Sequence, residues 1–149
     1  LGPYFLVIRA GYFAPPSYTA AELAEYRAFL AGGGVLWQVS DVHPSGDGLS
    51  GALGVNMSGA YFGVAATFAS HQITEGVTGH SYEAGGSVIS GPIPQDVAVL
   101  GWLDVERTLP IMGIKEHPTG RIFFIGDING LEGVPQPLVS NLLEWTVSP

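Results

Sequence analysis

The chain has 149 residues, of which 46% are hydrophobic and 12% are charged, and these values fit a single folded domain with a substantial core. Lys and Arg total 5 against 13 Asp and Glu, so the formal net charge is −8, which argues against binding to nucleic acid or anionic membranes because both depend on Lys and Arg. The chain has no cysteine, which excludes disulfides, zinc–thiolate sites and a thiol nucleophile.

The first part of the chain predicts a βαβ unit. Tyr4–Ile8 is an uninterrupted apolar run, as expected of a strand that is buried on both faces of a parallel sheet. After a proline-containing loop, a helix over Thr19–Ala31 is predicted to open with a capping box, because Glu22 stands three residues after its first threonine. The triplet Gly32-Gly33-Gly34 ends this helix, and Val35–Val39 follows as a second buried strand. Such crossovers join parallel strands with a right-handed turn.

The rest of the chain predicts a few further elements. They are a short helix at Leu49–Leu53, short strands and turns in the Gly-rich stretch 54–91, strands at Val97–Leu103 and Arg121–Ile125 with Ile111–Lys115 as an antiparallel partner, and an amphipathic helix over Pro137–Val147. Together these elements predict an α/β fold with a doubly wound, mostly parallel sheet that has helices packed against it. We see no linker that would divide the domain, which we expect to span 1–149.

Composition and chain ends suggest a location. No apolar stretch approaches the ~20 residues that span a bilayer, so we expect no membrane insertion. A single lysine (Lys115), many glycines and few charges are typical of secreted or cell-surface proteins. Because the chain starts at Leu1 without an initiator Met or a signal peptide, we expect it to be a piece of a longer protein.

Four motifs carry a resemblance to a known family. They are Thr19-Ala-Ala-Glu22, Phe29-Leu-Ala-Gly-Gly-Gly-Val-Leu36, His71-Gln-Ile-Thr-Glu-Gly-Val77 and Gly120-Arg-Ile-Phe-Phe-Ile-Gly-Asp127. In these motifs the chain resembles the class I glutamine amidotransferase-like superfamily, near its trehalose-utilisation-like and intraflagellar-transport-type branches. The resemblance implies a flavodoxin-like sheet. It also implies one or two βα units ahead of Tyr4, so the sheet would be truncated at the amino terminus and completed by other residues of the parent or by another chain.

The resemblance further implies a degenerate member of that family. In active amidotransferases a cysteine stands on a sharp turn after the strand that matches Val35–Val39, but here the turn reads Ser40-Asp41-Val42-His43. After the last strand the chain reads Asp127-Ile-Asn129-Gly130, without the late His-x-Glu pattern of the family. Cysteine-dependent amidotransferase activity is therefore excluded.

The carboxyl ends of the predicted strands are the expected position of a ligand site. Asp41 and His43 follow one strand and Asp127 follows another, so these three are the candidate catalytic residues of a hydrolase. Carboxylates there could hold a divalent cation such as calcium, with Asp41, Asp47 and Asp127 as candidate ligands. Further candidate ligand-binding residues at strand ends are Asp104, Asn129 and Trp102. The alternative is that these polar residues only cap helices and tie turns.

Weaker patterns favour structural roles. The segment 41–48 alternates oxygen-bearing or imidazole side chains as a calcium loop does, but it lacks the closing bidentate Glu and is predicted to be a solvated turn. Ser40 lacks the flanking glycines of a nucleophile elbow. The histidines His71, His80 and His117 show no ligand spacing, and the aromatic residues Tyr12, Phe13, Tyr61, Phe62 and Trp102 fit a sugar or peptide groove and core packing equally well.

These observations favour a non-catalytic accessory or interaction domain of a larger, extracellular or cell-surface protein. The alternative is a hydrolase that uses Asp41, His43 and Asp127, with or without a metal. Tyr4–Ile8 has no charge or proline that would protect a sheet edge, so we expect it to pair with another protein chain or with a missing part of the parent chain.

Overall fold

The structure is a computed structural model that describes residues 5–11, 17–65, 67–116, 118–127, 131 and 137–148, without the side chains of 65 and 80–85. The predictions made for Tyr4, Tyr12, Phe13, His117 and Asn129 therefore lie outside the described residues, as does the His80 side chain. No helix among the described residues is long and apolar enough to cross a membrane.

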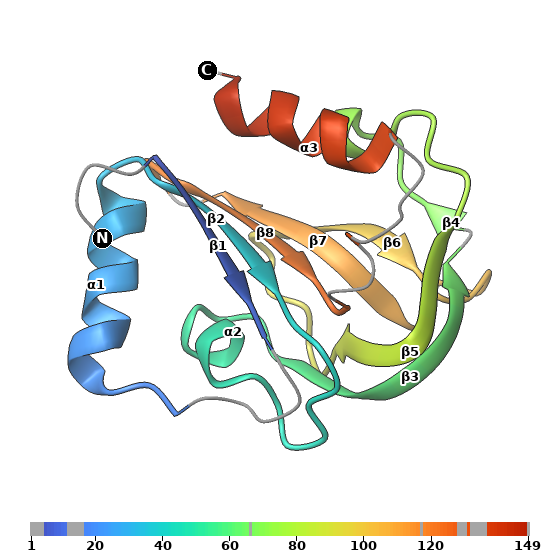
Figure 1. Ribbon diagram of the computed structural model, residues 1–149, viewed down its shortest axis with the longest axis horizontal. Coiled ribbons are helices and arrows are strands. Elements are labelled where there is room, and N and C mark those ends of the chain that lie inside the picture. The colour runs from blue at the N-terminus through green and yellow to red at the C-terminus, as the bar shows by residue number, and fades with distance from the viewer. Residues whose placement is uncertain are drawn as a thin grey trace.

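Eight strands, three α-helices and one 3-10 helix are present in the described chain (Figure 1). They are β1 (Leu6–Ala10), α1 (Ala20–Ala31), β2 (Val35–Val39), α2 (Gly48–Ala52), β3 (Met57–Ala65), β4 (Thr67–Phe68), η1 (Gln72–Thr74), β5 (His80–Ile89), β6 (Val97–Trp102), β7 (Pro110–Glu116), β8 (Arg121–Ile125) and α3 (Pro137–Val147). The predicted bounds of β2, β8 and α3 are confirmed, whereas β1 begins and ends two residues later than predicted.

The central sheet has six strands in the order β1-β2-β8-β7-β6-β4. β1, β2 and β8 are parallel neighbours, and β7 runs antiparallel to both β8 and β6. β6 therefore points in the same direction as β1, β2 and β8, and only β7 and the short β4 are reversed. The prediction of an α/β fold with a mostly parallel sheet is confirmed, as is the prediction of an antiparallel strand at Ile111–Lys115, which lies within β7.

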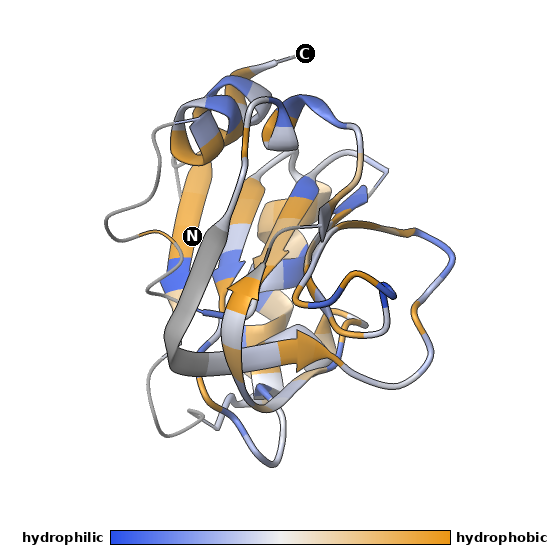
Figure 2. Cartoon of the chain, turned by 90° about the vertical axis from the view of Figure 1, so that its right-hand side faces the viewer, coloured by the Kyte–Doolittle hydropathy of each residue, from blue (hydrophilic) through white to orange (hydrophobic). Residues whose placement is uncertain are grey.

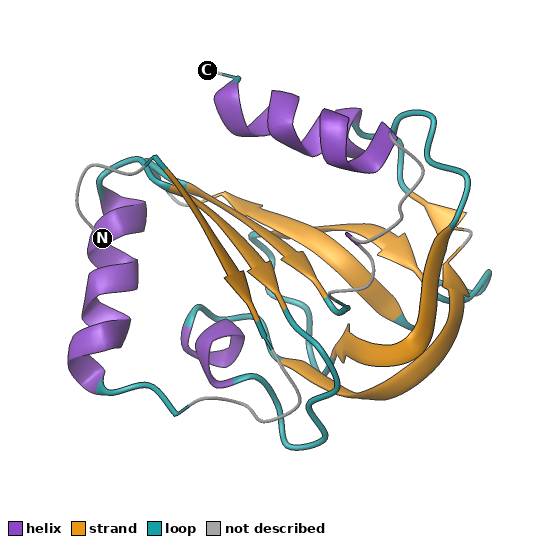
Figure 3. Ribbon diagram, viewed as in Figure 1, coloured by secondary structure: helices purple, strands orange, loops and turns teal. Residues whose placement is uncertain are grey.

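Helices cover both faces of this sheet, as the doubly wound prediction requires (Figure 3). On one face α3 packs with Leu138, Leu142 and Trp145 against a core that includes Trp37 and Phe123. On the other face the end of α1 packs against a second core, whose members include Phe29, Leu30, Leu36, Ile122 and Phe124. Figure 2 shows the apolar strands of the sheet lying beneath α3.

The two ends of α1 are fixed by a capping box and by a close contact with the chain that leads into β8. Thr19 accepts a hydrogen bond from the Glu22 backbone at 3.2 Å, and the Glu22 carboxylate accepts one from the Thr19 backbone at 2.7 Å, so the predicted capping box is confirmed. At the other end, a Cβ on Gly120 would lie 2.4 Å from the Leu30 carbonyl oxygen. Gly120 therefore allows the start of β8 to pass directly against the end of α1.

The Gly-rich middle of the chain forms a long curved ribbon, which differs from the predicted short strands and turns. β3 and β5 pair antiparallel with two register irregularities, and Figure 1 shows the ribbon curving around the sheet. Met57 and Ile89 anchor one end of the ribbon in the core, whereas Phe62 and Val64 are exposed on β3. The prediction failed because Gly59 and Gly63 take positive φ angles that interrupt the alternation of a regular strand.

β1 is the outermost strand at one end of the sheet, and this position corrects one expectation. The apolar run predicted a strand buried on both faces, but Phe5 is 62% exposed and Ile8 is 53% exposed. Only β2 pairs with β1 in the described chain. The accompanying expectation, that this strand is an edge without protecting charge, agrees with the fold, because Arg9 turns inward and is buried.

Candidate functional site

The carboxyl ends of β1, β2 and β8 lie next to one another and carry a cluster of buried polar residues. Because the three strands are parallel neighbours, the segments that follow them leave the same edge of the sheet (Figure 1). The backbone of Ser40 donates to the Ile125 carbonyl at 2.8 Å, which joins the two segments that carry Asp41 and Asp127. The cluster contains Arg9, Gln38, Ser40, Asp41, His43, Asp47 and Asp127, all of which are buried.

Asp47 is the centre of this cluster. One carboxylate oxygen caps α2 by accepting from the backbone of Leu49 and Ser50 at 3.0 and 3.1 Å. The other oxygen accepts from the Arg9 guanidinium in a buried ion pair, and it lies 3.2 Å from the Gln38 amide nitrogen and 3.3 Å from the Ser40 hydroxyl. The carboxylate thus ties the end of β1 and the end of β2 to the start of α2.

His43 lies beside this ion pair and is fully buried. Its Nε2 is 3.4 Å from the Asp47 carboxylate. Burial lowers the pKa of His43 below its ordinary value, Asp47 and Asp41 oppose that shift, and Arg9 adds to it. The ring is therefore neutral near pH 7, and the His43 backbone is joined to Gly59 of the ribbon in both directions, at 2.9 and 3.1 Å.

The other two candidate catalytic residues are buried as well. The Asp41 carboxylate accepts from the backbone of Val42 at 2.7 Å, and the Asp41 carbonyl accepts from the Ser87 hydroxyl. Asp127 follows β8 with no exposed surface. The prediction that 41–48 is a solvated turn is therefore wrong for Asp41, His43 and Asp47, whose side chains are buried. It holds for Pro44, Ser45 and Gly48, which are exposed.

Several polar atoms in the cluster have no hydrogen-bond partner among the described residues. They are a terminal nitrogen of Arg9, Oε1 of Gln38 and both ring nitrogens of His43. Buried polar atoms are normally paired, so this cluster is an electrostatically costly part of the described core. No three His, Asp or Glu side chains in that part of the chain are arranged to hold a metal ion, and the cation predicted at Asp41, Asp47 and Asp127 gains no support.

Trp102 and Asp104 lie apart from this cluster. Trp102 is the last residue of β6 and Asp104 follows that strand, and β7 separates β6 from β8. Asp104 closes its own loop by accepting from the Thr108 hydroxyl and from the backbone of Thr108 and Leu109. Partial desolvation raises the pKa of Asp104, but these hydrogen bonds outweigh it and the pKa is lowered. Arg107, in the same loop, has a positive backbone φ of 59°. Its guanidinium carbon lies 4.7 Å from the centroid of the Trp102 ring.

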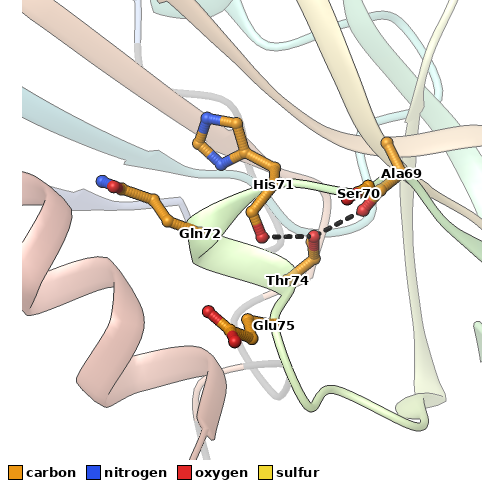
Figure 4. A pocket seen from close by; sticks show the side chains of 6 residues that line it. All are labelled: Ala69, Ser70, His71, Gln72, Thr74 and Glu75. Carbon is orange, nitrogen blue, oxygen red and sulfur yellow. Dashed lines mark hydrogen bonds between the residues drawn. The ribbon is translucent and has the colours of Figure 1, made fainter.

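Sequence reasoning missed a shallow hollow at η1. Its lining consists of Ala69, Ser70, His71, Gln72, Thr74 and Glu75 (Figure 4). His71 Nδ1 accepts from the Ile73 backbone at 3.2 Å and so caps η1, and the Thr74 hydroxyl donates to the Ala69 carbonyl at 2.6 Å. Figure 4 shows the His71 ring and the Glu75 carboxylate extending to opposite sides of η1. Burial lowers the pKa of His71, and Glu116 opposes that shift.

These contacts give the His71 hollow a structural explanation. Each polar group that caps η1 satisfies a backbone group of the turn, which is the usual role of such side chains. The signal in the sequence was the spacing from His71 to Thr74, which suits the cap of a short helical turn.

The described surface also exposes large apolar side chains. They are Phe5, Ile8, Phe62, Val64, Ile93, Val105, Leu143 and Val147. Phe5 and Ile8 belong to β1 or precede it directly, and Leu143 and Val147 stand one helical turn apart on α3.

Comparisons with known proteins identify the fold. No model of a protein family matches the chain, and no curated protein matches its sequence. The solved structure of the mmIFT52 N-terminal domain is similar with a TM-score of 0.71 and 13% identity, over 97% of this chain and 78% of that one. The cytoplasmic protein STM3548 from Salmonella typhimurium is similar with a TM-score of 0.56 and 15% identity, over 94% of this chain and 70% of that one.

These similarities concern the fold alone, since both identities are low. They support the intraflagellar-transport-type fold that the resemblance in the sequence implied. Membership of the wider glutamine amidotransferase-like superfamily stays a prediction.

Proposed function

We propose that the chain is a non-catalytic interaction domain that binds a segment of protein along the outer edge of β1. The observation that carries this proposal is the edge itself. Among the residues that the structure describes, β1 pairs with β2 on one side only, has exposed Phe5 and Ile8, and carries no outward charge or proline that would discourage pairing. The proposed source of the segment is another protein chain. An extracellular or cell-surface location is part of the proposal and rests on composition.

The burial of the candidate catalytic residues supports a non-catalytic role. A general base must reach the proton that it abstracts, but His43 has no exposed surface and Asp41 is only 7% exposed. Asp47 is engaged in an ion pair and a helix cap, which are structural tasks. The hydrolase alternative is therefore the weaker one.

Turnover assays test the absence of catalysis. Amide, ester and glycoside substrates should show no turnover that depends on the cluster. The matched variants are Asp41→Ala, in the cluster, and Asp104→Ala, in the loop after β6. Turnover that Asp41→Ala abolishes in a folded protein, and that Asp104→Ala leaves intact, would establish the hydrolase instead.

Photo-crosslinking tests the edge. A photo-reactive phenylalanine analogue at Ile8 should capture a protein segment in the cells that produce this protein, whereas the same analogue at Val105 should not, although Val105 is also exposed. Adding Ala10→Pro should abolish capture, because proline removes an outward N–H that a partner strand would use. Equal capture from Ile8 and Val105, or capture that survives Ala10→Pro, would refute binding along β1.

A further inference from the structure

The start of β3 carries an Asn-x-Ser triplet, Asn56-Met57-Ser58. Of the three asparagines in the chain, only Asn56 has a serine or threonine two residues later, since Asn129 is followed by Gly-Leu and Asn141 by Leu-Leu. This triplet is the acceptor signal for N-linked oligosaccharides on exported proteins. Because so short a signal also arises by chance, the geometry of its side chains decides whether Asn56 is suited to be an acceptor.

The triplet lies on an extended segment that puts its two polar side chains on one side. Met57 is fully buried in the core, whereas Asn56 is exposed and Ser58 is half-buried. Successive side chains of a strand point to opposite faces, so the burial of Met57 directs Asn56 and Ser58 toward the surface. The acceptor amide and the hydroxyl that the signal requires two residues later therefore share the outer face of β3.

Two contacts fix the orientation of the Asn56 side chain. Its Nδ2 donates to Ser90 Oγ at 2.8 Å, and Ser58 Oγ lies 2.7 Å from the same Ser90 oxygen. Its Oδ1 points toward Gly46, where an ideal Cβ would lie 3.1 Å away. The amide nitrogen carries two N–H groups, and the bond to Ser90 uses one of them. Since a bond to a sugar replaces only one N–H, Asn56 keeps a donor for Ser90 after modification.

The surface beside Asn56 has room for a bulky sugar. Gly91, which follows Ser90, is exposed and has a positive φ of 75°. Apart from its chain neighbours, no atom of the described chain lies within 4 Å of the place that a Cβ on Gly91 would take. Gly54, two residues before Asn56, is exposed as well. A sugar attached to Nδ2 therefore extends into solvent and does not press against the sheet.

We propose that Asn56 is the acceptor of an N-linked oligosaccharide. The donor is an oligosaccharide linked to a polyprenol phosphate, and a transferase of the export route catalyses the step. A bond forms between Asn56 Nδ2 and the anomeric carbon of the first sugar. The bond from that carbon to the phosphate oxygen breaks, and the lipid phosphate leaves with the electron pair. The proton that Nδ2 loses passes to a base of the transferase.

The burial of Met57 indicates when this transfer takes place. A transferase has to reach Asn56 and Ser58 together, but in the folded chain β3 pairs with β5 and Met57 is held in the core. The transfer therefore precedes folding, during export of the chain. The inference rests on the extracellular or cell-surface location in the proposed function, and it does not depend on the segment that binds β1.

Export of the full chain from cultured cells that N-glycosylate their secreted proteins tests the inference. The chain is given a secretion leader, and the chain in the lysate and in the medium is compared by gel electrophoresis before and after treatment with peptide:N-glycosidase. We expect a slower band that the enzyme converts to the unmodified size. Mass spectrometry should place the modification at Asn56, because the enzyme converts the modified amide to a carboxyl.

Variants at two serines show whether the triplet is the cause. Ser58→Ala should abolish the slower band, because the hydroxyl is part of the signal, and Ser58→Thr should retain it. Ser90→Ala is the matched control, since it removes the hydrogen-bond partner of Asn56 and Ser58 but leaves the triplet intact, and it should keep the slower band. Because the lysate is read together with the medium, a variant that folds poorly and is retained in the cell still reports its modification.

Three results would overturn the inference. They are an exported chain with an unmodified Asn56, a slower band that survives Ser58→Ala, and a peptide without a glycan at Asn56 in the protein made by its own cells. Binding along β1 is judged separately, because capture from Ile8 depends on neither Asn56 nor Ser58. Failure of that capture would end the proposed strand binding and leave the result at Asn56 unchanged.

Discussion

The buried ion pair between Arg9 and Asp47 allows the sharpest test of the structure. Asp47→Asn retains an oxygen that can cap α2, because asparagine is as good an N-cap as aspartate, but it removes the negative charge. The Arg9 side chain is 7% exposed and the Asp47 side chain 0% exposed, so the substitution leaves a buried guanidinium without its counter-ion. Breaking one side of a buried pair costs about 3–5 kcal/mol in the free energy of unfolding.

That loss is large compared with the total stability of a domain, which is about 5–15 kcal/mol. For a chain of this size we expect the melting temperature to fall by roughly 6–20 °C, at about 2–4 °C per kcal/mol. Urea unfolding and thermal melting, each followed by circular dichroism, measure the two quantities.

Two further variants decide the cause of that loss. Arg9→Met combined with Asp47→Asn removes both charges and should recover most of the stability, because replacing a whole buried pair is far cheaper than breaking it. Asp104→Asn makes the same chemical change at a carboxylate in an exposed loop and should cost about 1 kcal/mol or less. If Asp47→Asn is no more harmful than Asp104→Asn, the ion pair is not buried and our description of the cluster is wrong.

Three other predictions concern the same cluster and the first helix. Gly11→Ala should lower the free energy of unfolding by about 1–3 kcal/mol in urea melts, because the new Cβ would lie 2.8 Å from Arg9 and 2.9 Å from His43. An unchanged urea melt would show that the backbone around Gly11 can shift to accommodate the added methyl group. The folded-state pKa of His43 lies below its ordinary 6.5, so the unfolded chain binds protons more readily and stability should fall as the pH drops below about 6.5; His43→Gln should flatten this decline, and equal slopes would contradict a neutral His43. Thr19→Ala should cost about 1 kcal/mol in thermal melts through loss of the capping box, and no loss would show that the box is not formed in solution.

Local signals predicted much of the fold. The capping box at Thr19, the bounds of β2 and β8 and the helix that begins at Pro137 are all read from neighbouring residues, since helix caps and apolar runs act over a few positions. The ribbon of β3 and β5 was not predicted, because it depends on pairing between distant segments and on glycines with positive φ that break the strand pattern.

The candidate site, too, was predicted in part from the sequence and decided in part by the tertiary structure. The sequence by itself determined that cysteine chemistry is absent and that Asp41, His43 and Asp47 stand after a strand, close together in the chain. Only the tertiary structure decided that these side chains are buried and that Asp47 pairs with Arg9, which lies 38 residues away. The same holds for the outward face of β1, because an apolar run reads alike in a central strand and in an edge strand, and the difference lies in which neighbours the rest of the chain supplies.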